Sequence, residues 1–271
     1  MESLVMGVLN VTPDSFSDGG NYLNIKSAVA QAEKMLKEGA SIIDIGGQSS
    51  RPGAQEVSSL EETNRVIPVI KALKETFPAV KISVDTYSPE VIAAALPYDI
   101  WAINDITALS NKDSIAMLKG TEVKVCLMHM QNRPHNMQEA PTYDNVLHEV
   151  YSYLVNRVNS CIASGIAKDN IYIDPGFGFG KSLEHNKILL NNLDFFKKIG
   201  VPILVGMSRK SMLGQILNKP VNDRLYGGIA AAVIACINGA AIIRTHDVAA
   251  TVDALKVTEA IMNTNITEEL L

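Results

Sequence analysis

The sequence predicts a (β/α)8 barrel, the TIM-barrel fold of the α/β class, formed by a single domain over residues 1–271. Short runs of β-branched and other apolar residues alternate with longer amphipathic stretches from one end of the chain to the other. Most of the short runs lack alternating polar residues, which is typical of parallel strands buried on both faces. The length of 271 residues suits such a barrel, which uses about 250. A doubly wound open sheet is the alternative that the same rhythm allows.

Eight short segments have the composition of buried strands. They cover residues 4–9, 41–44, 81–84, 100–103, 123–128, 170–173, 202–205 and 241–243. Between them, apolar residues recur with a period near 3.6 and therefore share one face of a helix. The clearest such faces are formed by Ile25, Val29, Ala32 and Leu36, by Ile67, Ile70, Leu73 and Phe77, by Leu147, Val150, Leu154, Val158 and Cys161, and by Val248, Val252 and Leu255.

The composition excludes several classes of protein. Lys and Arg total 24 against 29 for Asp and Glu, so the net charge of −5 leaves no basic surplus for binding nucleic acid. The uncharged stretch that contains residues 227–243 is interrupted by an Asn-Gly pair, and we expect no membrane span there. The first residues lack the segments of a signal peptide. Because Cys126, Cys161 and Cys236 are far apart, we expect reduced thiols in a cytoplasmic protein.

Polar and glycine-rich clusters come directly after the expected strands, whereas the connections that lead back into strands are short. The clusters cover residues 10–20, 44–54, 83–91, 103–106, 126–134, 173–182, 205–213 and 242–248. In a parallel barrel, the loops that follow the strands meet at the carboxyl-terminal face, where active sites are built. The sequence therefore predicts an active site at that face.

Three hydrogen-bond acceptors lie at the ends of expected strands. Asp85 and Asp174 each follow a β-branched strand directly, and Asn104 ends a third. A carboxylate at the barrel mouth loses solvation unless a partner donates hydrogen bonds to it. Several such acceptors suit a planar heterocycle that presents N–H donors along one edge. The alternative for either aspartate alone is a structural role, as a helix cap or at the start of a turn.

Basic residues gather after the seventh and eighth strands, where barrels often bind phosphate. Arg244 and His246 are two residues apart, so an extended backbone directs both side chains to the same side. Together they can bind an anionic group through charge-assisted hydrogen bonds. Lys210 lies in the preceding loop, and Arg51 and Asn10 lie on neighbouring loops. The alternatives are a solvated loop lysine for Lys210 and a helix-capping or core histidine for His246.

Three motifs that suggest other chemistry are incomplete. Residues 176–182 resemble a phosphate-binding P-loop, but Pro175 stands where that motif needs glycine. The first strand is not followed by the glycine pattern of a dinucleotide-binding fold. His129 and His135 have no cysteine or glutamate at ligand spacing, so we expect no structural zinc site. A Schiff-base role for Lys210, as in barrel aldolases, is an open alternative, and so is a phosphosugar isomerase.

Taken together, the loop motifs resemble the dihydropteroate synthase family from residue 6 to about residue 248. The motifs are NVTPDSFSDGG, GGQSSRPG, SVDT, INDI, DPGFGFGK, SRKS and RTHD, in the order of the family. The resemblance implies a barrel enzyme that uses Mg2+. Such an enzyme joins 6-hydroxymethyl-7,8-dihydropterin pyrophosphate to p-aminobenzoate and releases dihydropteroate and pyrophosphate. It also implies a homodimer, for which residues 227–241 either supply an interface or pack against the barrel.

The resemblance also assigns roles to individual residues. The pterin is expected beside Asp85, Asn104, Met128, Asp174 and Lys210. The pyrophosphate is expected beside Asn10, Ser50, Arg51, Arg244 and His246, with Asn10 as a ligand of Mg2+. The p-aminobenzoate slot is assigned to Pro13, Phe16, Phe179, Ser208 and Lys210. The residues expected to act in catalysis are Asp85, Asp174, Lys210, Arg244 and His246.

Two residues of the second loop depart from the usual family pattern. Ser50 stands where the family commonly has threonine, and it keeps the hydroxyl group. Gln48 stands where the family commonly has glutamate, so one negative charge is missing.

For the reaction, we expect the C–O bond between the pterin methylene and pyrophosphate to break before the amine attacks. Asp85 and Asp174 would stabilise the developing cation, while Arg244, His246 and Mg2+ would stabilise the departing pyrophosphate. Closure of the first two loops would exclude water.

Two alternatives share the pterin site: a folate-dependent methyltransferase of the same barrel family and a non-catalytic pterin-binding paralogue.

Overall fold

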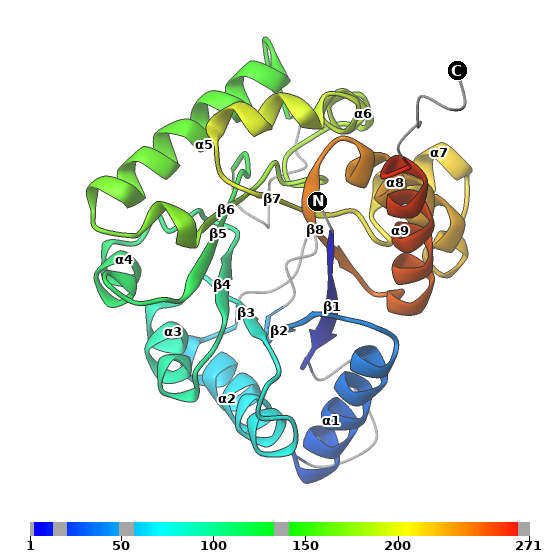
Figure 1. Ribbon diagram of the computed structural model, residues 1–271. Coiled ribbons are helices and arrows are strands. Elements are labelled where there is room, and N and C mark those ends of the chain that lie inside the picture. Colours follow the sequence, from blue (N-terminus) through cyan, green and yellow to red (C-terminus); the bar gives the residue numbers. More distant parts are fainter. Residues whose placement is uncertain (1–2, 13–20, 49–56, 133–140, 265–271) are drawn as a thin grey trace.

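The predicted (β/α)8 barrel is confirmed, because eight parallel strands pair in chain order and close into a cylinder (Figure 1). This computed structural model describes residues 3–12, 21–48, 57–132 and 141–264. The strands are β1 (Leu4–Asn10), β2 (Ile42–Gly46), β3 (Ile82–Asp85), β4 (Ala102–Asp105), β5 (Lys124–Met128), β6 (Ile171–Asp174), β7 (Ile203–Gly206) and β8 (Ala240–Thr245). β1 pairs with both β2 and β8, which excludes the open sheet.

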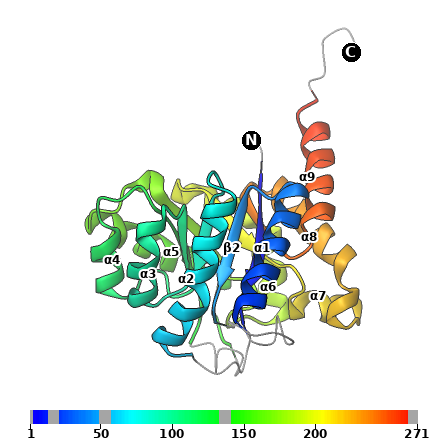
Figure 2. The same ribbon diagram turned by 90° about the horizontal axis from the view of Figure 1, so that it is seen from below.

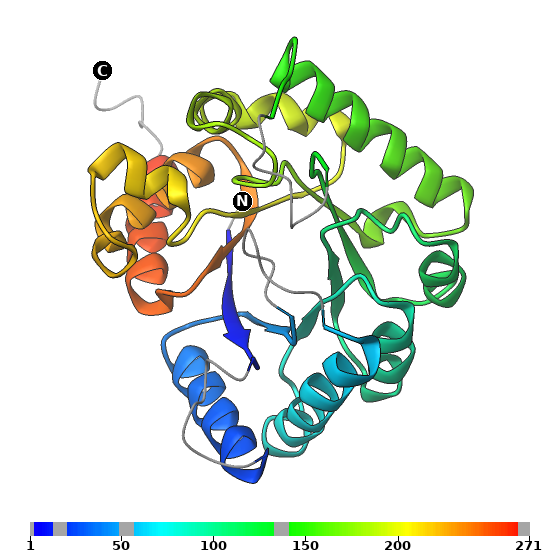
Figure 3. The same ribbon diagram turned by 180° about the vertical axis from the view of Figure 1, so that it is seen from behind.

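Helices form a ring outside the strands, as both faces of the barrel show (Figures 1 and 3). They are α1 (Asn21–Lys37), α2 (Ser59–Thr76), α3 (Pro89–Ala95), α4 (Lys112–Leu118), α5 (Val146–Ala163), α6 (Leu183–Asn191), α7 (Ser211–Leu217), α8 (Leu225–Ile237) and α9 (Val248–Met262). The connection from β7 to β8 holds both α7 and α8, one helix more than a strict alternation predicts.

Successive strand residues point to opposite sides of the sheet, so apolar residues pack both outside and inside the barrel. Outward-facing residues such as Ile43 and Val84 pack against helix residues such as Ile70 and Leu73. Inside the barrel, Met6, Ile42, Cys126, Leu204 and Ile242 form a separate cluster near the amino-terminal ends of the strands. Apolar side chains therefore fill the interior near the amino-terminal ends of the strands. The carboxyl-terminal end of the interior is left for polar residues and chemistry.

Strand register brings polar residues together above this inner cluster. Asn10 pairs with Gly46, Gly46 with Asp85, and Asp85 with Asn104. Arg244 is two residues beyond Ile242, a member of the inner cluster, so it points into the barrel as well. The residues expected at the site thus share both the same end and the same side of the sheet.

The uncharged stretch that contains residues 227–243 forms most of α8 and the start of β8. Ala231, Ala232 and Ala235 are buried, whereas Ile234 and Ile237 are exposed. This helix therefore packs against its neighbours and also presents an apolar outer face. In the part of the chain that the structure describes, no helix is long and apolar enough to cross a membrane. Figure 2 shows the end of α9 projecting beyond the other helices.

Candidate active site at the carboxyl-terminal mouth of the barrel

One arginine and two aspartates form the charged centre of the mouth. Arg244 donates from Nε to Asp44 Oδ2 at 2.6 Å and from Nη2 to Asp85 Oδ2 at 2.7 Å. Asp44 is fully buried in β2, and Asp85 is the last residue of β3. Buried charges are tolerated only when they are paired, because each has lost its hydration. A single guanidinium therefore balances two carboxylates.

Asp44 is a site residue that the sequence analysis did not single out. Its Oδ2 also accepts from Asn104 Nδ2 at 3.3 Å, so Asp44 connects an expected pterin residue to Arg244. Its Oδ1 is buried without a hydrogen-bond partner among the described residues. An acidic residue in the middle of an otherwise apolar strand, Ile42–Gly46, is the sequence signal that could have identified it.

The environment of the aspartates favours their protonated forms. Burial raises the pKa of Asp85 to about 7; the Arg244 guanidinium opposes the rise and the negative charge of Asp44 adds to it. Burial also raises the pKa of Asp174, and the positive charge of Lys210 opposes that rise. Perturbed carboxyl groups of this kind are typical of binding and catalytic sites.

The structural alternatives for the two aspartates have different outcomes. The helix-capping alternative for Asp85 is wrong, because the N-cap of α3 is Ser88, whose Oγ accepts from Val91 N–H at 3.4 Å. Asp174 does stabilise a turn, since its Oδ1 accepts from Gly176 N–H at 2.7 Å. That turn role places the Asp174 carboxylate at the mouth and does not remove it from the site.

Lys210 lies against the loop that follows β6. Its Nζ donates to the carbonyl oxygen of Phe177 and lies 4.6 Å from the centroid of the Phe179 ring. Burial lowers the pKa of Lys210 to about 8, and the carboxylate of Asp174 opposes this change. The alternative of a solvated loop lysine is therefore wrong. The Phe179 ring also belongs to an apolar cluster with Met128 and Ile106.

His246 and Ser208 join the loops that follow β7 and β8. Ser208 Oγ accepts from the backbone N–H of His246 at 3.2 Å and lies 3.1 Å from His246 Nδ1. Arg209 and Asp247 form an ion pair at 2.6 Å between the same loops. Because the N-cap position of α9 is Asp247, the helix-capping alternative for His246 is wrong.

Asn10 lies where a divalent ion could share the mouth with an anionic substrate. Asn10 Oδ1 and Asp85 Oδ2 each lie 3.7 Å from the position that a Cβ on Gly46 would occupy. In the described ranges, no group of three or more His, Cys, Asp or Glu could hold a metal ion. An oxygen ligand such as Asn10 still fits Mg2+, which commonly takes few protein ligands and completes its shell with water and substrate phosphate.

Some expected site residues lie outside the described residues, namely Pro13, Phe16, Ser50 and Arg51. Gln48 is described, and its Nε2 donates to the hydroxyl of Tyr87 at 3.1 Å. The amide at this position therefore donates a hydrogen bond that a carboxylate could not donate.

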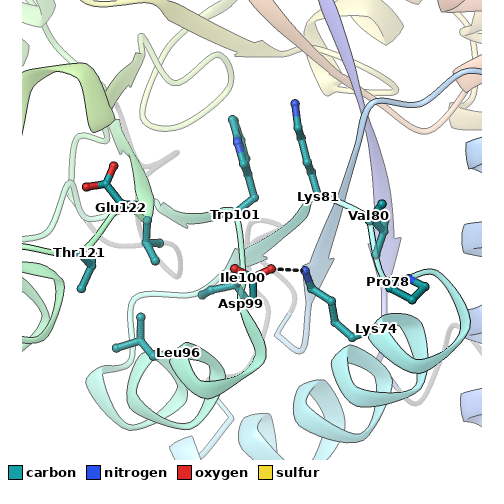
Figure 4. A pocket seen from close by; sticks show the side chains of 12 residues that line it. Lys74, Pro78, Val80, Lys81, Leu96, Asp99, Ile100, Trp101, Thr121 and Glu122 are labelled. Atoms are coloured by element: carbon teal, nitrogen blue, oxygen red, sulfur yellow. Dashed lines mark hydrogen bonds and ion pairs between the residues drawn. The ribbon is translucent and has the colours of Figure 1, made fainter.

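A hollow of about 550 Å³ lies at the opposite, amino-terminal end of the barrel (Figure 4). Its lining comes from segments that lead into β3, β4 and β5 and includes Lys74, Asp99, Trp101 and Glu122. Lys74 and Asp99 pair with each other at 3.2 Å. None of the expected site residues lines this hollow. The described residues among them lie at the carboxyl-terminal mouth, which is therefore the candidate site.

The fold and this mouth define a TIM-barrel protein with a polar, charged site at the carboxyl-terminal face. Comparison with known proteins agrees: the model of the pterin-binding enzyme family matches residues 6–246. Dihydropteroate synthase of Escherichia coli K12 is 52% identical over 96% of this chain and 92% of its own length. The Haemophilus influenzae synthase is 49% identical over 96% of this chain and 94% of its own.

Solved structures give the same result. Yersinia pestis dihydropteroate synthase in complex with a sulfonamide drug has a TM-score of 0.92 and 48% identity, covering 97% of this chain and 95% of that one. The Xanthomonas albilineans synthase with 7,8-dihydropteroate has a TM-score of 0.87 and 42% identity, covering 97% and 95%. The chain belongs to the pterin-binding enzyme family and, within it, to the dihydropteroate synthases, which are transferases.

Proposed function

We propose that this protein condenses 6-hydroxymethyl-7,8-dihydropterin pyrophosphate with p-aminobenzoate to give 7,8-dihydropteroate and pyrophosphate. The observation that carries the proposal is the convergence of Asp85, Asn104, Asp174, Lys210 and Arg244 at one barrel mouth in a chain of this family. The related enzyme of Xanthomonas albilineans has been solved with 4-aminobenzoic acid and with 7,8-dihydropteroate.

The pterin would be recognised through its N–H groups. The carboxylates of Asp85 and Asp174 and the amide of Asn104 supply the acceptors that such an edge needs. The apolar side chain of Met128, which belongs to a cluster at the same mouth, would form a wall against the ring. A buried acceptor without a donor is unfavourable, so this pocket selects a heterocycle that donates several hydrogen bonds.

The pyrophosphate would bind at the basic side of the mouth, formed by Arg244 and His246. In this proposal the phosphate oxygens and a pterin N–H together replace the ion pair between Arg244 and Asp85. The exchange keeps both buried charges paired, because the guanidinium gains an anion while the carboxylate gains a donor. Ser50 and Arg51 would reach the same group from the second loop.

Asn10 would hold Mg2+ together with the substrate phosphates. When bound, Mg2+ would neutralise negative charge on the pyrophosphate.

The chemistry transfers the pterin methylene from oxygen to nitrogen. The C–O bond to pyrophosphate breaks first, the ring delocalises the positive charge, and the amine of p-aminobenzoate then forms the C–N bond and releases a proton to solvent. Asp85 and Asp174 stabilise the cation electrostatically, while Arg244 and His246 stabilise the leaving group. Aryl amines are neutral near pH 7, so no strong general base is required.

The p-aminobenzoate slot would lie beside Phe179, Ser208 and Lys210, with Pro13 and Phe16 contributed by the first loop. Lys210 Nζ lies above the Phe179 ring, so an aromatic carboxylate there would meet a cation and a stacking surface. The same lysine also lies near Asp174, which would join the two subsites.

The proposed assembly is a cytoplasmic homodimer. Large apolar side chains are exposed on three adjacent helices, and we call this surface the α7–α9 face (Figure 1). Its members are Ile216, Leu217, Leu225, Tyr226, Ile234, Ile237, Val257, Ile261 and Met262. Exposed apolar patches of this kind mark protein–protein contacts, and a second copy of the chain is the partner that we propose.

Pyrophosphate release by the purified protein tests the proposed function. The protein is given dihydropterin pyrophosphate and Mg2+, with and without p-aminobenzoate. Release that requires p-aminobenzoate and yields dihydropteroate supports the proposal. Pterin binding without release in either tube contradicts it and favours the methyltransferase or the non-catalytic paralogue, because both would bind the pterin without this reaction.

A further inference from the structure

Lys181 is a fully buried lysine that the proposed reaction does not use. It lies in the loop after β6 and is the lysine of the segment 176–182, whose sequence resembles a P-loop. Its Nζ lies 2.9 Å from Gly176 O, 3.0 Å from Phe179 O and 2.9 Å from His129 Nδ1. This lysine thus contacts two backbone carbonyls of its own loop and the ring of His129, whereas a P-loop lysine contacts phosphate.

His129 brings a second loop into this arrangement. It is the residue after β5, and its backbone N–H donates to Asp174 O at 2.9 Å. A Cβ added to Gly176 would lie 1.9 Å from His129 O, so the two loops are in direct backbone contact. Both tautomers of the ring can make the bond to Lys181, since Nδ1 accepts from an ammonium or donates to an amine. Burial lowers the pKa of His129 to about 3, and the positive charge of Lys181 adds to this effect.

The loop held by Lys181 carries two groups of the proposed aminobenzoate slot. Lys181 binds the carbonyls of Gly176 and Phe179, while the carbonyl of Phe177 between them accepts from Lys210. The ring of Phe179 in turn lies 4.6 Å from Lys210 Nζ. A shift of this short loop would therefore move the stacking surface and the cation together.

We infer that Lys181 is a positioning residue: by bonding to His129, Gly176 and Phe179 it fixes the Phe179 ring and Lys210 for binding of p-aminobenzoate. The inference rests on the proposed function for the identity of that substrate. It makes Lys181 a determinant of amine binding, although its side chain does not contact the amine.

Steady-state kinetics of Lys181→Met test the inference. The methionine keeps the length and apolar stem but removes the donors. We expect the KM for p-aminobenzoate to rise at least about tenfold, which corresponds to about 1.4 kcal/mol, the scale of one net hydrogen bond. The affinity for the pterin pyrophosphate, measured by calorimetry, should fall by a clearly smaller factor, because Asp85, Asn104 and Arg244 lie on β3, β4 and β8 and not on this loop. Equal losses for both substrates, or wild-type kinetics, would overturn the inference.

Lys124→Met is the matched control. Lys124 is a partly buried lysine at the start of β5, and its Nζ donates to Asn170 Oδ1 at 2.6 Å, near the other end of the barrel. Its replacement also removes a lysine hydrogen bond but leaves the loop after β6 intact. We expect an unchanged KM for p-aminobenzoate. The same rise in both variants would show a general loss of stability and would refute a positioning role for Lys181.

A pair of His129 variants keeps the inference testable if Lys181→Met does not fold. His129→Asn retains an acceptor close to the position of Nδ1, whereas His129→Leu removes it. We expect His129→Leu to raise the KM for p-aminobenzoate and His129→Asn to restore most of the loss. Equal KM values in the two variants would contradict the inference.

Hydrogen exchange separates this inference from the proposed function. In whichever of Lys181→Met and His129→Leu folds, amide exchange in residues 175–182 should be faster than in wild type, with the rest of the barrel unchanged. This measurement needs no substrate. Unchanged exchange there would reject the positioning role, whereas a wild-type protein that makes no dihydropteroate would reject the proposed function alone.

Discussion

At the scale of single residues, the centre of the barrel mouth is an ion-pair cluster with one positive and two negative side chains. Arg244 is the partner of both Asp44 and Asp85, and all three side chains are largely removed from water. One guanidinium cannot fully compensate two carboxylates, so the negative charge of Asp44 disfavours ionisation of Asp85. Burial is the main reason that the pKa of Asp85 is raised to about 7; the Arg244 guanidinium opposes the rise, and the negative charge of Asp44 adds to it.

Asp85→Asn tests whether this carboxylate stabilises the transition state. We expect kcat/KM for the pterin pyrophosphate to fall by about 30-fold or more, equivalent to about 2 kcal/mol, the scale of one charge-assisted hydrogen bond. In the wild type, kcat/KM should also fall as the pH drops below about 7, because protonated Asp85 carries no negative charge and one of its two oxygens becomes a donor. The pH profile of the variant should lack this acid limb. An unchanged limb would assign it to another group.

Asp44→Asn tests whether Asp44 controls Asp85 through Arg244. The substitution removes a negative charge that raises the pKa of Asp85 and leaves Arg244 to pair with Asp85 alone. We therefore expect the acid limb of kcat/KM to move to lower pH by about one unit, equivalent to about 1.4 kcal/mol. Titration of the pH–rate profile measures the shift. A limb that stays in place or moves to higher pH would disprove the coupling.

At the scale of elements, the loop after β6 is shaped by glycines with positive φ. Gly176 has φ +73° and Gly178 has φ +82°, a region that side chains with a Cβ rarely adopt. Gly176 has a second constraint, because any Cβ would overlap His129 O. The loop can therefore approach the end of β5 only with glycine at this position, and that approach brings His129 to Lys181.

Gly176→Ala and Gly120→Ala separate these two constraints. Gly120 has φ +74°, nearly the same conformation, but a Cβ there would meet nothing within 4 Å. We expect Gly120→Ala to lower the free energy of unfolding by about 1 kcal/mol, from backbone strain alone. Gly176→Ala should lower it by about 3 kcal/mol or more, because the backbone must also move. Urea denaturation measures both, and equal losses would refute the steric argument.

At the scale of the whole molecule, the distribution of exposed apolar residues is uneven. The α7–α9 face contains Tyr226, which is 81% exposed, and Ile261, which is 68% exposed. The helices α7, α8 and α9 lie side by side on one flank of the barrel (Figures 1 and 2). A second copy that covers this flank would leave the mouth of each barrel accessible.

Tyr226→Asp tests the proposed homodimer. A charge on this apolar face would lose hydration when a second copy covers it, so we expect the dimer to dissociate at least about tenfold more readily, equivalent to about 1.4 kcal/mol. Sedimentation velocity over a range of concentrations measures the change. Leu60→Asp is the control, since Leu60 is 72% exposed on α2, away from this face. A monomeric wild type, or equal effects of the two substitutions, would contradict the assignment.

The sequence by itself determined the barrel, its eight strands and the end that carries the chemistry. Apolar runs and helical periodicity are local signals, and the end of each strand fixes where its following loop lies. Asp85, Asn104, Asp174 and Lys210 could be proposed for the same reason, because each stands in a polar cluster after a strand.

Only the tertiary structure decided which charges are paired. Arg244 pairs with Asp44, which is 200 positions away in the sequence, and Lys181 contacts His129, which is 52 positions away. Closure of the barrel places β1 between β2 and β8, and the alternation of strand residues turns Asp44 and Arg244 inward, where lost hydration requires each charge to have a partner. Contacts between residues so far apart leave no periodic signal in the sequence. They form because the fold buries both side chains in the same place, and not because of their spacing along the chain.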